Sequence, residues 1–291
     1  MLTLPNAVAA LLALIPYLAM AFFGQKLTGA IGSAPAAARL LAPSLLCLPY
    51  AVVAISAGAF RWPWLVLYAL LPVVLAAILD WARRADPEQK SIWRDFLVLI
   101  PLGLAVDLRW FEPAWPAHLA VFNKVLLLDA GIYGFRIIRQ LAGVGFDLRL
   151  RRRDLYLGLR EFLLYTPVAI ALGLSLGFLH THAIWPSPKQ FGGSFLFTFF
   201  FIAVPEELYF RGWMQNLLER RMGRYPALIG TAILFGLSHW NKRSTGFNWQ
   251  YVLLAAIAGV FYGRAWRAER RVGASAMTHA MVDTVWSIWL R

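Results

Sequence analysis

Long apolar stretches follow one another along the chain, and short segments rich in polar and basic residues separate them. Because about 20 consecutive apolar residues form a helix long enough to cross the hydrocarbon core of a bilayer, each stretch predicts a membrane span. Several stretches are short, so we expect about eight to ten transmembrane helices. The expected spans are Leu4–Phe23, Leu41–Phe60, Trp62–Leu79, Phe96–Phe111, Ala117–Ile138, Glu161–Leu179, Gly193–Trp213, Pro226–Trp240, Trp249–Arg264 and Val272–Leu290.

The composition is that of a membrane protein. Of the 291 residues, 60% are hydrophobic and 15% are charged, and the mean hydropathy is +0.60, whereas a soluble domain is about 45–50% apolar and about 25% charged. Alternating segments of the outer-membrane barrel type are absent, so helices are the only spanning structure open to this chain. The expected fold class is all-α, a polytopic helical bundle in the membrane. The single cysteine, Cys47, excludes an intrachain disulfide and argues against a cysteine-based zinc site.

The formal net charge of +13 comes from 28 Lys and Arg against 15 Asp and Glu. Twenty of the 28 basic residues fall in five segments between expected spans: 26–39, 83–94, 136–160, 220–224 and 264–271. Loops rich in Lys and Arg stay in the cytoplasm, so the charge predicts topology and not a nucleic-acid partner. We expect an integral protein of a bacterial inner membrane, with these basic loops cytoplasmic and both termini outside.

Two adjacent glutamates and an arginine end one of the apolar runs. Charged groups in apolar surroundings cost several kcal/mol unless they are paired or used in function. On a helix, Glu207 and Arg211 are four residues apart and can form an ion pair, whereas Glu206 points about 100° away. Either this is a structural ion pair with a spare glutamate, or Glu206 is a general base that the ion pair holds in place.

A proline directly precedes the two glutamates. Pro205 fits the first turn of a helix, where its missing N–H costs nothing. We therefore expect a helix break at Pro205, with both glutamates in the first turn of a new half-helix. The positive end of the helix dipole would favour their charge there.

Two histidines lie within expected spans, and each has a second notable residue at helical spacing. Phe235 precedes His239 by four residues, and Asp283 follows His279 by four, so each pair shares one helical face. Burying each polar group separately in a membrane is costly, and a shared polar cavity lowers that cost. We therefore expect both histidines, Asp283 and the glutamate pair to meet in one cavity.

Three charged residues lie in or near two adjacent spans of the first half: Asp107, Lys124 and Asp129. Such residues can mark an ion path through a membrane protein. No recurring spacing connects them to the later motifs, so we favour a structural pairing between neighbouring helices.

Three motifs together resemble those of the CAAX protease and bacteriocin-processing family of intramembrane endopeptidases, whose eukaryotic and archaeal members are the type II CAAX prenyl endopeptidases. The motifs are Glu206-Glu207-x-x-x-Arg211, Phe235-x-x-x-His239 and His279-x-x-x-Asp283. They occur in this order on apolar segments, about 30–40 residues apart. The resemblance covers about residues 193–291, roughly a third of the chain.

The resemblance implies a role for each matched residue. Glu206 corresponds to the catalytic carboxylate that activates water, and His239 to its partner in orienting that water. His279 corresponds to a group that stabilises the oxyanion. Three further matched residues are expected to support the site: Glu207, Arg211 and Phe235. The implied substrate is a peptide or the C-terminal tail of a membrane-associated protein, and prenylated CAAX tails are the substrate of the eukaryotic members.

Asp283 stands where the family has Asn or, in some bacterial members, Asp. An amide can donate a hydrogen bond to an oxyanion, and an ionised carboxylate cannot. Asp283 is therefore protonated, orients His279 or ligates a metal. Family members have been described both as metalloproteases and as metal-independent glutamic proteases, and each mechanism gives these residues a different part.

A catalytic zinc ion is the alternative to a purely glutamic mechanism. Glu206, His239 and His279 could hold zinc, with water in the fourth position. The His-Glu-x-x-His zinc signature is absent from the chain. We favour the glutamic mechanism, which needs no cofactor, and keep zinc as the alternative.

These expectations combine into one functional hypothesis. Residues 1–160 are expected to be N-terminal membrane helices of unassigned role, and residues 161–291 the protease core of one continuous membrane domain. Peptide hydrolysis needs a base, an oxyanion donor and an acid for the leaving amine, which the motif residues can supply. The expected function is an intramembrane endopeptidase of glutamic or metallo type, acting in the lipid bilayer on a membrane-associated peptide or protein.

Two other classes use the same residues differently. A proton-coupled transporter could use the buried Glu and His groups as a relay, but we find no paired broken segments in two matching halves, which such carriers often have. A non-catalytic immunity or scaffold protein could keep the fold without the chemistry. Site geometry distinguishes these classes, because a peptidase needs its base and its histidines around one water.

Overall fold

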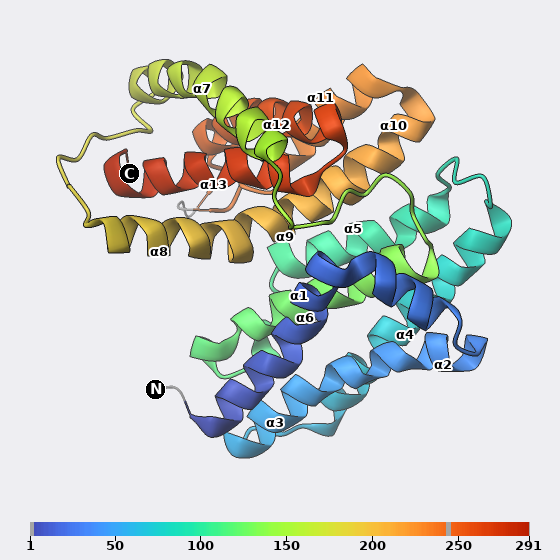
Figure 1. Cartoon of the computed structure of the whole chain (residues 1–291). Coiled ribbons are helices and arrows are strands. Elements are labelled where there is room, and N and C mark those ends of the chain that lie inside the picture. Colours follow the sequence, from blue (N-terminus) through green and yellow to red (C-terminus); the bar gives the residue numbers. More distant parts are fainter. Residues whose placement is uncertain (1–2, 243–245, 291) are drawn as a thin grey trace. The chain divides into compact units, whose positions relative to one another are not determined.

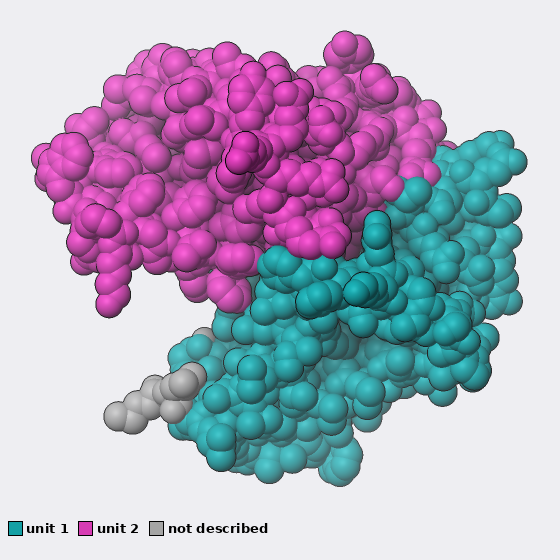
Figure 2. Space-filling view, viewed as in Figure 1, with its two compact units in different colours: residues 1–142 teal, residues 143–291 magenta. Residues whose placement is uncertain are grey.

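The computed structural model of the chain describes residues 3–242 and 246–290. Every regular element in these ranges is a helix, which confirms the expected all-α fold class and agrees with a helical membrane bundle (Figure 1). The chain forms two compact units, residues 1–142 and residues 143–291 (Figure 2). The predicted boundary between residues 160 and 161 lies between helices of unassigned role and the expected protease core, and it stays a prediction.

The first unit contains six α-helices. They are α1 (Leu4–Gly32), α2 (Ala36–Leu41), α3 (Leu48–Ser56), α4 (Trp62–Ala85), α5 (Trp93–Asp107) and α6 (Val121–Ile132). Helix α1 packs against α3 and α6, and α4 packs against α5. A π-helical turn, Tyr133–Ile138, follows α6. Directly after it, Arg139 is fully buried and donates to the carboxylates of Asp86 and Asp95, each at 2.7 Å, which ties together the segments after α4, at the start of α5 and after α6.

The second unit contains the remaining helices. They are α7 (Arg152–Ser175), α8 (Pro188–Thr198), α9 (Val204–Glu207), α10 (Asn216–Met222), α11 (Arg224–Leu237), α12 (Trp249–Glu269) and α13 (Val272–Trp289). Two π-helical segments, Phe199–Ala203 and Leu208–Gln215, connect α8, α9 and α10 into one helix, Pro188–Met222. Helix α13 packs against α7, α8 and α12, and α12 also packs against α7 and α11. Polar side chains on α13 can therefore reach groups on several neighbouring helices.

The predicted helix break at Pro205 is wrong. The residues on both sides of the proline have right-handed helical dihedral angles, and the helix continues through them. A proline lacks the N–H for a helical hydrogen bond and its ring pushes away the carbonyl four residues earlier, which normally kinks an α-helix. Here a π-helical segment directly precedes Val204, and its wider turn takes up that displacement. The glutamates thus lie inside a long helix, far from its N-terminus.

Five described helices are long and apolar enough to cross a membrane by length and composition. They are Leu4–Gly32, Ala36–Ser56, Trp62–Ala85, Arg152–Ser175 and Pro188–Met222. Fewer helices meet these criteria than the eight to ten spans expected from the apolar pattern. Helices α12 and α13 have the length, but they carry polar groups such as Arg264, His279 and Asp283 that lower their hydropathy.

Asp129 does not form the charge pair that was expected between neighbouring helices of the first unit. Its side chain on α6 is buried, and neither carboxyl oxygen has a hydrogen-bond partner in the part of the chain that the structure describes. Lys124, one turn earlier on the same helix, is exposed. Asp129 and Lys124 thus form no ion pair with each other within the described residues.

Candidate active site

The two adjacent glutamates have different surroundings. The Glu207 side chain is fully buried, whereas the Glu206 side chain is 28% exposed. Arg211 Nε donates to Glu207 Oε2 at 3.1 Å, so the predicted i,i+4 ion pair is present. The Ser275 hydroxyl on α13 also hydrogen-bonds to Glu207 Oε2 and lies 3.0 Å from the Tyr262 carbonyl oxygen. Glu207 is thus held from two helices.

His279 links Glu207 to the other acidic groups. Its Nδ1 lies 2.9 Å from Glu207 Oε1, and its Nε2 lies 3.5 Å from Asp283 Oδ2 and 4.0 Å from Glu206 Oε2. The imidazole stacks on the Tyr262 ring with centroids 4.6 Å apart. Both ring nitrogens therefore face carboxylate oxygens, and an imidazolium can donate to both sides.

His239 lies in the turn after α11. Its Nδ1 is 2.8 Å from the Phe235 carbonyl oxygen, which can only accept, so this nitrogen carries the proton. The other nitrogen, Nε2, is then available as an acceptor. His239 lines the same pocket as His279 and Asp283. The expected meeting of Glu206 and His239 around one water stays a prediction.

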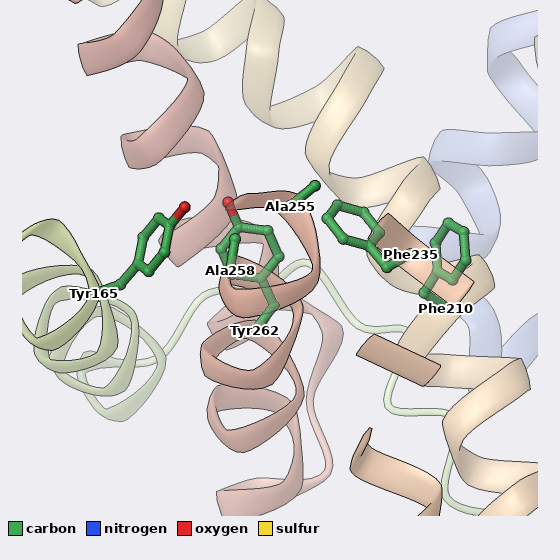
Figure 3. Close-up of a cluster of buried hydrophobic side chains, with 6 residues drawn as sticks. All are labelled: Tyr165, Phe210, Phe235, Ala255, Ala258 and Tyr262. Carbon is green, nitrogen blue, oxygen red and sulfur yellow. The ribbon is translucent and has the colours of Figure 1, made fainter. Parts of the chain in front are cut away.

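Phe235 fills the space between the polar groups. Its ring contacts His239 at 4.9 Å and His279 at 5.6 Å between centroids. It belongs to a cluster of buried side chains drawn in Figure 3: Tyr165, Phe210, Phe235, Ala255, Ala258 and Tyr262. The Phe210 and Phe235 rings meet edge to face at 5.0 Å. The cluster fixes the ring that separates the two histidines and gives the site a low-polarity wall.

A pocket opens beside these residues. It has an empty volume of about 680 Å³, which includes space open to the outside. His239, His279 and Asp283 line it. Most other lining residues are apolar or aromatic and come from α7, α12 and α13: among them are Phe162, Tyr165, Tyr251, Leu254, Ala258 and Trp286. Glu206 is not a lining residue, but its Oε2 lies 4.0 Å from Nε2 of the lining residue His279.

Two residues near the site were not predicted from the sequence. Lys242 Nζ lies 3.9 Å from Glu206 Oε1, and its backbone N–H donates to the His239 carbonyl. Ser275 precedes His279 by four residues, the same spacing that connects His279 to Asp283. That spacing could have identified Ser275, whereas Lys242 comes from a loop and no helical periodicity points to it.

A bound metal ion needs several donor side chains that converge on one point. No group of three or more His, Cys, Asp or Glu side chains in the described ranges is arranged to hold a metal ion. Both nitrogens of His279 face carboxylate oxygens, and Nδ1 of His239 is used by a backbone carbonyl. Nε2 of His239 accepts no hydrogen bond from the described residues and Nε2 of His279 faces Glu206, so zinc held by Glu206, His239 and His279 stays the alternative, and the chemistry below is derived from the side chains alone.

Residues 188–285 match the family model of type II CAAX prenyl endopeptidase Rce1-like proteins. This part of the chain is similar to that family. The Rce1-like region covers roughly a third of the 291 residues, and the glutamate pair, Arg211, both histidines and Asp283 lie within it. No curated protein and no solved structure matches the chain significantly.

The Rce1-like match agrees with the resemblance found in the motifs and indicates protease activity and a membrane location. It extends from the start of α8 to a point near the end of α13, so it includes the glutamate pair, both histidines and Asp283. Helix α7, which forms one wall of the pocket, lies outside the matched residues. The Rce1-like region thus supplies the polar groups, and a segment before it supplies part of the pocket.

Proposed function

We propose that the protein is an intramembrane endopeptidase in which Glu206 and His239 activate a water molecule for attack on a peptide bond. The observation that carries the proposal is the meeting of Glu206, Asp283 and Glu207 around one imidazole, that of His279, beside a pocket that His239 also lines. A carrier would not need these groups around one point, whereas hydrolysis does.

The chemistry follows from the position of each group. Glu206 takes a proton from water, and His239 accepts a hydrogen bond from the same water through Nε2 and so orients it. The Nε2–H of His279 faces the space between Glu206 and Asp283 and can donate to the oxyanion that forms on the substrate carbonyl. Glu206, now protonated, returns the proton to the leaving amine.

Glu207 and Arg211 support this chemistry without touching the substrate. Glu207 is bonded to Arg211, Ser275 and His279 at once, so it fixes the ring plane of His279. A donor that is already oriented stabilises the transition state at little cost in reorganisation. Asp283 completes the arrangement on the other side of the imidazole.

The substrate that best fits the pocket is a peptide segment with large apolar groups from a membrane-associated protein, because aromatic and aliphatic side chains form most of the walls. The family name adds a more specific candidate, the prenylated tail of a CAAX protein. Both classes reach the site from the bilayer and not from bulk water.

The test compares cleavage of a membrane peptide by the purified wild-type protein and by Glu206→Gln. We expect kcat of the variant to fall at least about 100-fold, since a positioned general base contributes roughly 10²–10⁴. Glu269→Gln is the matched control, because Glu269 is partly exposed at the end of α12 and pairs there with Arg153 instead of a motif residue. Equal turnover by the wild type and Glu206→Gln contradicts the proposal.

A second arm of the experiment addresses the metal. The glutamic mechanism predicts that a chelator leaves kcat unchanged. Loss of activity in the chelator and its recovery with added zinc would reject that mechanism while keeping the peptidase. Assays with and without a prenyl group on otherwise identical peptides separate the two substrate classes.

A further inference from the structure

Helices α7 and α12 carry two arginines side by side. Arg160 on α7 donates to Glu161 Oε1 through Nε at 3.0 Å and Nη2 at 2.6 Å, and Arg264 Nε on α12 lies 3.2 Å from Glu161 Oε2. The Glu161 side chain is fully buried, whereas the two arginine side chains are 38% and 42% exposed. A buried carboxylate thus holds two guanidinium groups at the surface.

Some N–H donors of the Arg160 and Arg264 guanidinium groups are left over after the contacts with Glu161. A guanidinium has five N–H donors, and the contacts with Glu161 use only part of each set. No further hydrogen bond or ion pair of Arg160 or Arg264 is formed in the described ranges of the chain. Two arginines sharing one carboxylate leave a net positive charge, so the outward donors suit a second anion with several oxygens, such as a phosphate.

The surroundings of Arg160 are apolar. Tyr156, Leu163 and Leu164 lie three or four residues away on the same helix, and each is about half exposed. Leu159, beside Arg160 in the sequence, is also exposed. These side chains face lipid in a membrane-spanning helix, and Arg152–Ser175 is long and apolar enough to be one. A ligand of this site therefore combines a phosphate with apolar chains.

The site lies near one end of both helices. Arg153, in the first turn of α7, lies 3.5 Å from Glu269, the last residue of α12, and Arg160 is about two turns further along. Positive residues at helix ends occupy the headgroup region of a bilayer, where anionic lipids accumulate. The position of the site near the helix ends, its positive charge and its apolar neighbours thus all fit an anionic lipid.

We propose that Arg160 and Arg264, held by Glu161, form a binding site for the phosphate of an anionic phospholipid whose acyl chains lie along α7. Arg160 and Glu161 lie outside the residues that the family model matches, and Arg264 lies inside them. Phe162 and Tyr165, one and four residues after Glu161, line the pocket. A lipid in this site therefore reinforces the α7–α12 contact that forms one wall of the pocket.

The test measures lipid binding by native mass spectrometry on the delipidated full-length protein in detergent. Phosphatidylglycerol is compared with phosphatidylcholine of identical acyl chains, and inorganic phosphate is added as a competitor. We expect phosphatidylglycerol to bind at least about tenfold more tightly than phosphatidylcholine, because a charge-assisted hydrogen bond contributes about 1.5–3 kcal/mol and 1.4 kcal/mol is tenfold in affinity. Inorganic phosphate at the same concentration should not displace the lipid.

Two variants distinguish a binding site with a defined geometry from general attraction of the lipid to a positively charged surface. Arg160→Gln, Glu161→Gln and Arg264→Gln combined remove the site while leaving no buried charge unpaired. Arg160→Lys with Arg264→Lys keeps the charge and loses the two-pronged geometry. We expect both to weaken phosphatidylglycerol binding about tenfold or more. Arg149→Gln with Arg152→Gln, which removes two exposed charges nearby, should have little effect.

The proposal is overturned by any of three results. They are equal affinity of the wild type for the two lipids, unchanged phosphatidylglycerol binding by the lysine variant, and displacement of the lipid by equimolar inorganic phosphate. If the triple variant does not fold, the lysine variant decides alone, since it keeps the charge that Glu161 requires. None of these readouts depends on peptidase activity.

Discussion

Glu206 and Glu207 are the same residue type in adjacent positions, yet their contacts give them different tasks. Glu207 has hydrogen-bond partners on both oxygens and no exposure, so it is a fixed acceptor. Glu206 is partly exposed and lies about 4 Å from two basic groups, those of His279 and Lys242. A carboxylate with looser contacts can take up and release a proton during a reaction, which is the task proposed for Glu206.

Asp283 permits a test of how the oxyanion is stabilised. If its main task is to position His279 by a hydrogen bond, Asp283→Asn should keep kcat/KM within about tenfold of the wild type, because an amide can also accept or donate at 3.5 Å. Asp283→Ala should lose about 100-fold, since it leaves the Nε2 side of the imidazole without a partner. The measurement is kcat/KM on one membrane peptide.

The two variants share a control. Ser287→Ala changes an exposed residue one turn further along α13 that does not line the pocket. Activity loss in Asp283→Asn as large as that in Asp283→Ala would show that the negative charge, and not a hydrogen bond, is required.

At the residue scale the sequence predicts contacts with helical periodicity well. The pair Glu207–Arg211 and the neighbours His279 and Asp283 follow directly from a spacing of four. The bond from Glu207 to His279 joins residues 72 positions apart, and no local pattern contains that information. The position of Lys242 is even harder to predict, because it lies in a short turn and a turn has no periodicity.

Helices α11 and α12 pack closely because both have glycines at their contact. A Cβ atom added at Gly236 would lie 2.5 Å from the Val252 carbonyl oxygen and 2.8 Å from the Ala256 Cβ. A Cβ at Gly259 would lie 3.0 Å from the Ala232 Cα. Small residues at membrane-helix contacts permit this approach of the two backbones. The turn with His239 follows directly from this part of α11, so its position depends on the contact.

Gly236→Ala is therefore expected to destabilise the protein. The added methyl group meets a backbone carbonyl that cannot move without shifting α12, and overpacking of this kind costs about 1–3 kcal/mol. The check is the thermal unfolding midpoint in detergent, which should fall by several degrees. Gly230→Ala is the matched control on the same helix, because a Cβ there meets nothing within 4 Å. Equal midpoints for the two variants would show that α11 and α12 are not in close contact.

At the element scale the sequence predicts the existence of helices but not their internal geometry. Each expected span overlaps a described helix, because apolar stretches of this length leave few alternatives in a membrane. The π-helical segments Phe199–Ala203 and Leu208–Gln215 were missed, and with them the continuity of the helix through Pro205. A π-helical turn has no distinct composition, so the proline alone suggested a break that the wider turn prevents.

Each compact unit has a carboxylate with a lowered pKa in a segment outside the spans. In the first unit, burial raises the pKa of Asp86, but hydrogen bonds from the Lys90 backbone and the Arg139 guanidinium outweigh this and lower it below 3.8. In the second unit, the hydrogen bond from Arg149 is the largest cause that lowers the pKa of Asp147 to about 2. Both carboxylates favour the folded state when ionised.

The pH dependence of stability follows from the sign of these shifts. A carboxylate with a depressed pKa contributes stability above its unfolded value, here 3.8, and loses it as the pH falls towards the folded value. Arg149→Gln should therefore lower the thermal midpoint by about 1–2 °C at pH 5–7, and the difference should vanish between pH 4 and pH 2. Arg152→Gln is the control, since Arg152 is exposed and lies in the same basic segment. A constant difference at all pH values would assign the effect of Arg149 to packing.

The spacing of four residues between Ser275, His279 and Asp283 limits how related chains can diverge. All three side chains project from a single stripe of α13, and each step along it is close to one full helical turn. Replacing one of them changes one contact. Adding or losing one position between them swings the rest of the stripe by about 100° and carries the imidazole or the acid out of reach of its partner. Length in this stretch is therefore constrained together with these three positions, and homologous chains should contain exchanges at the positions between them but no gaps.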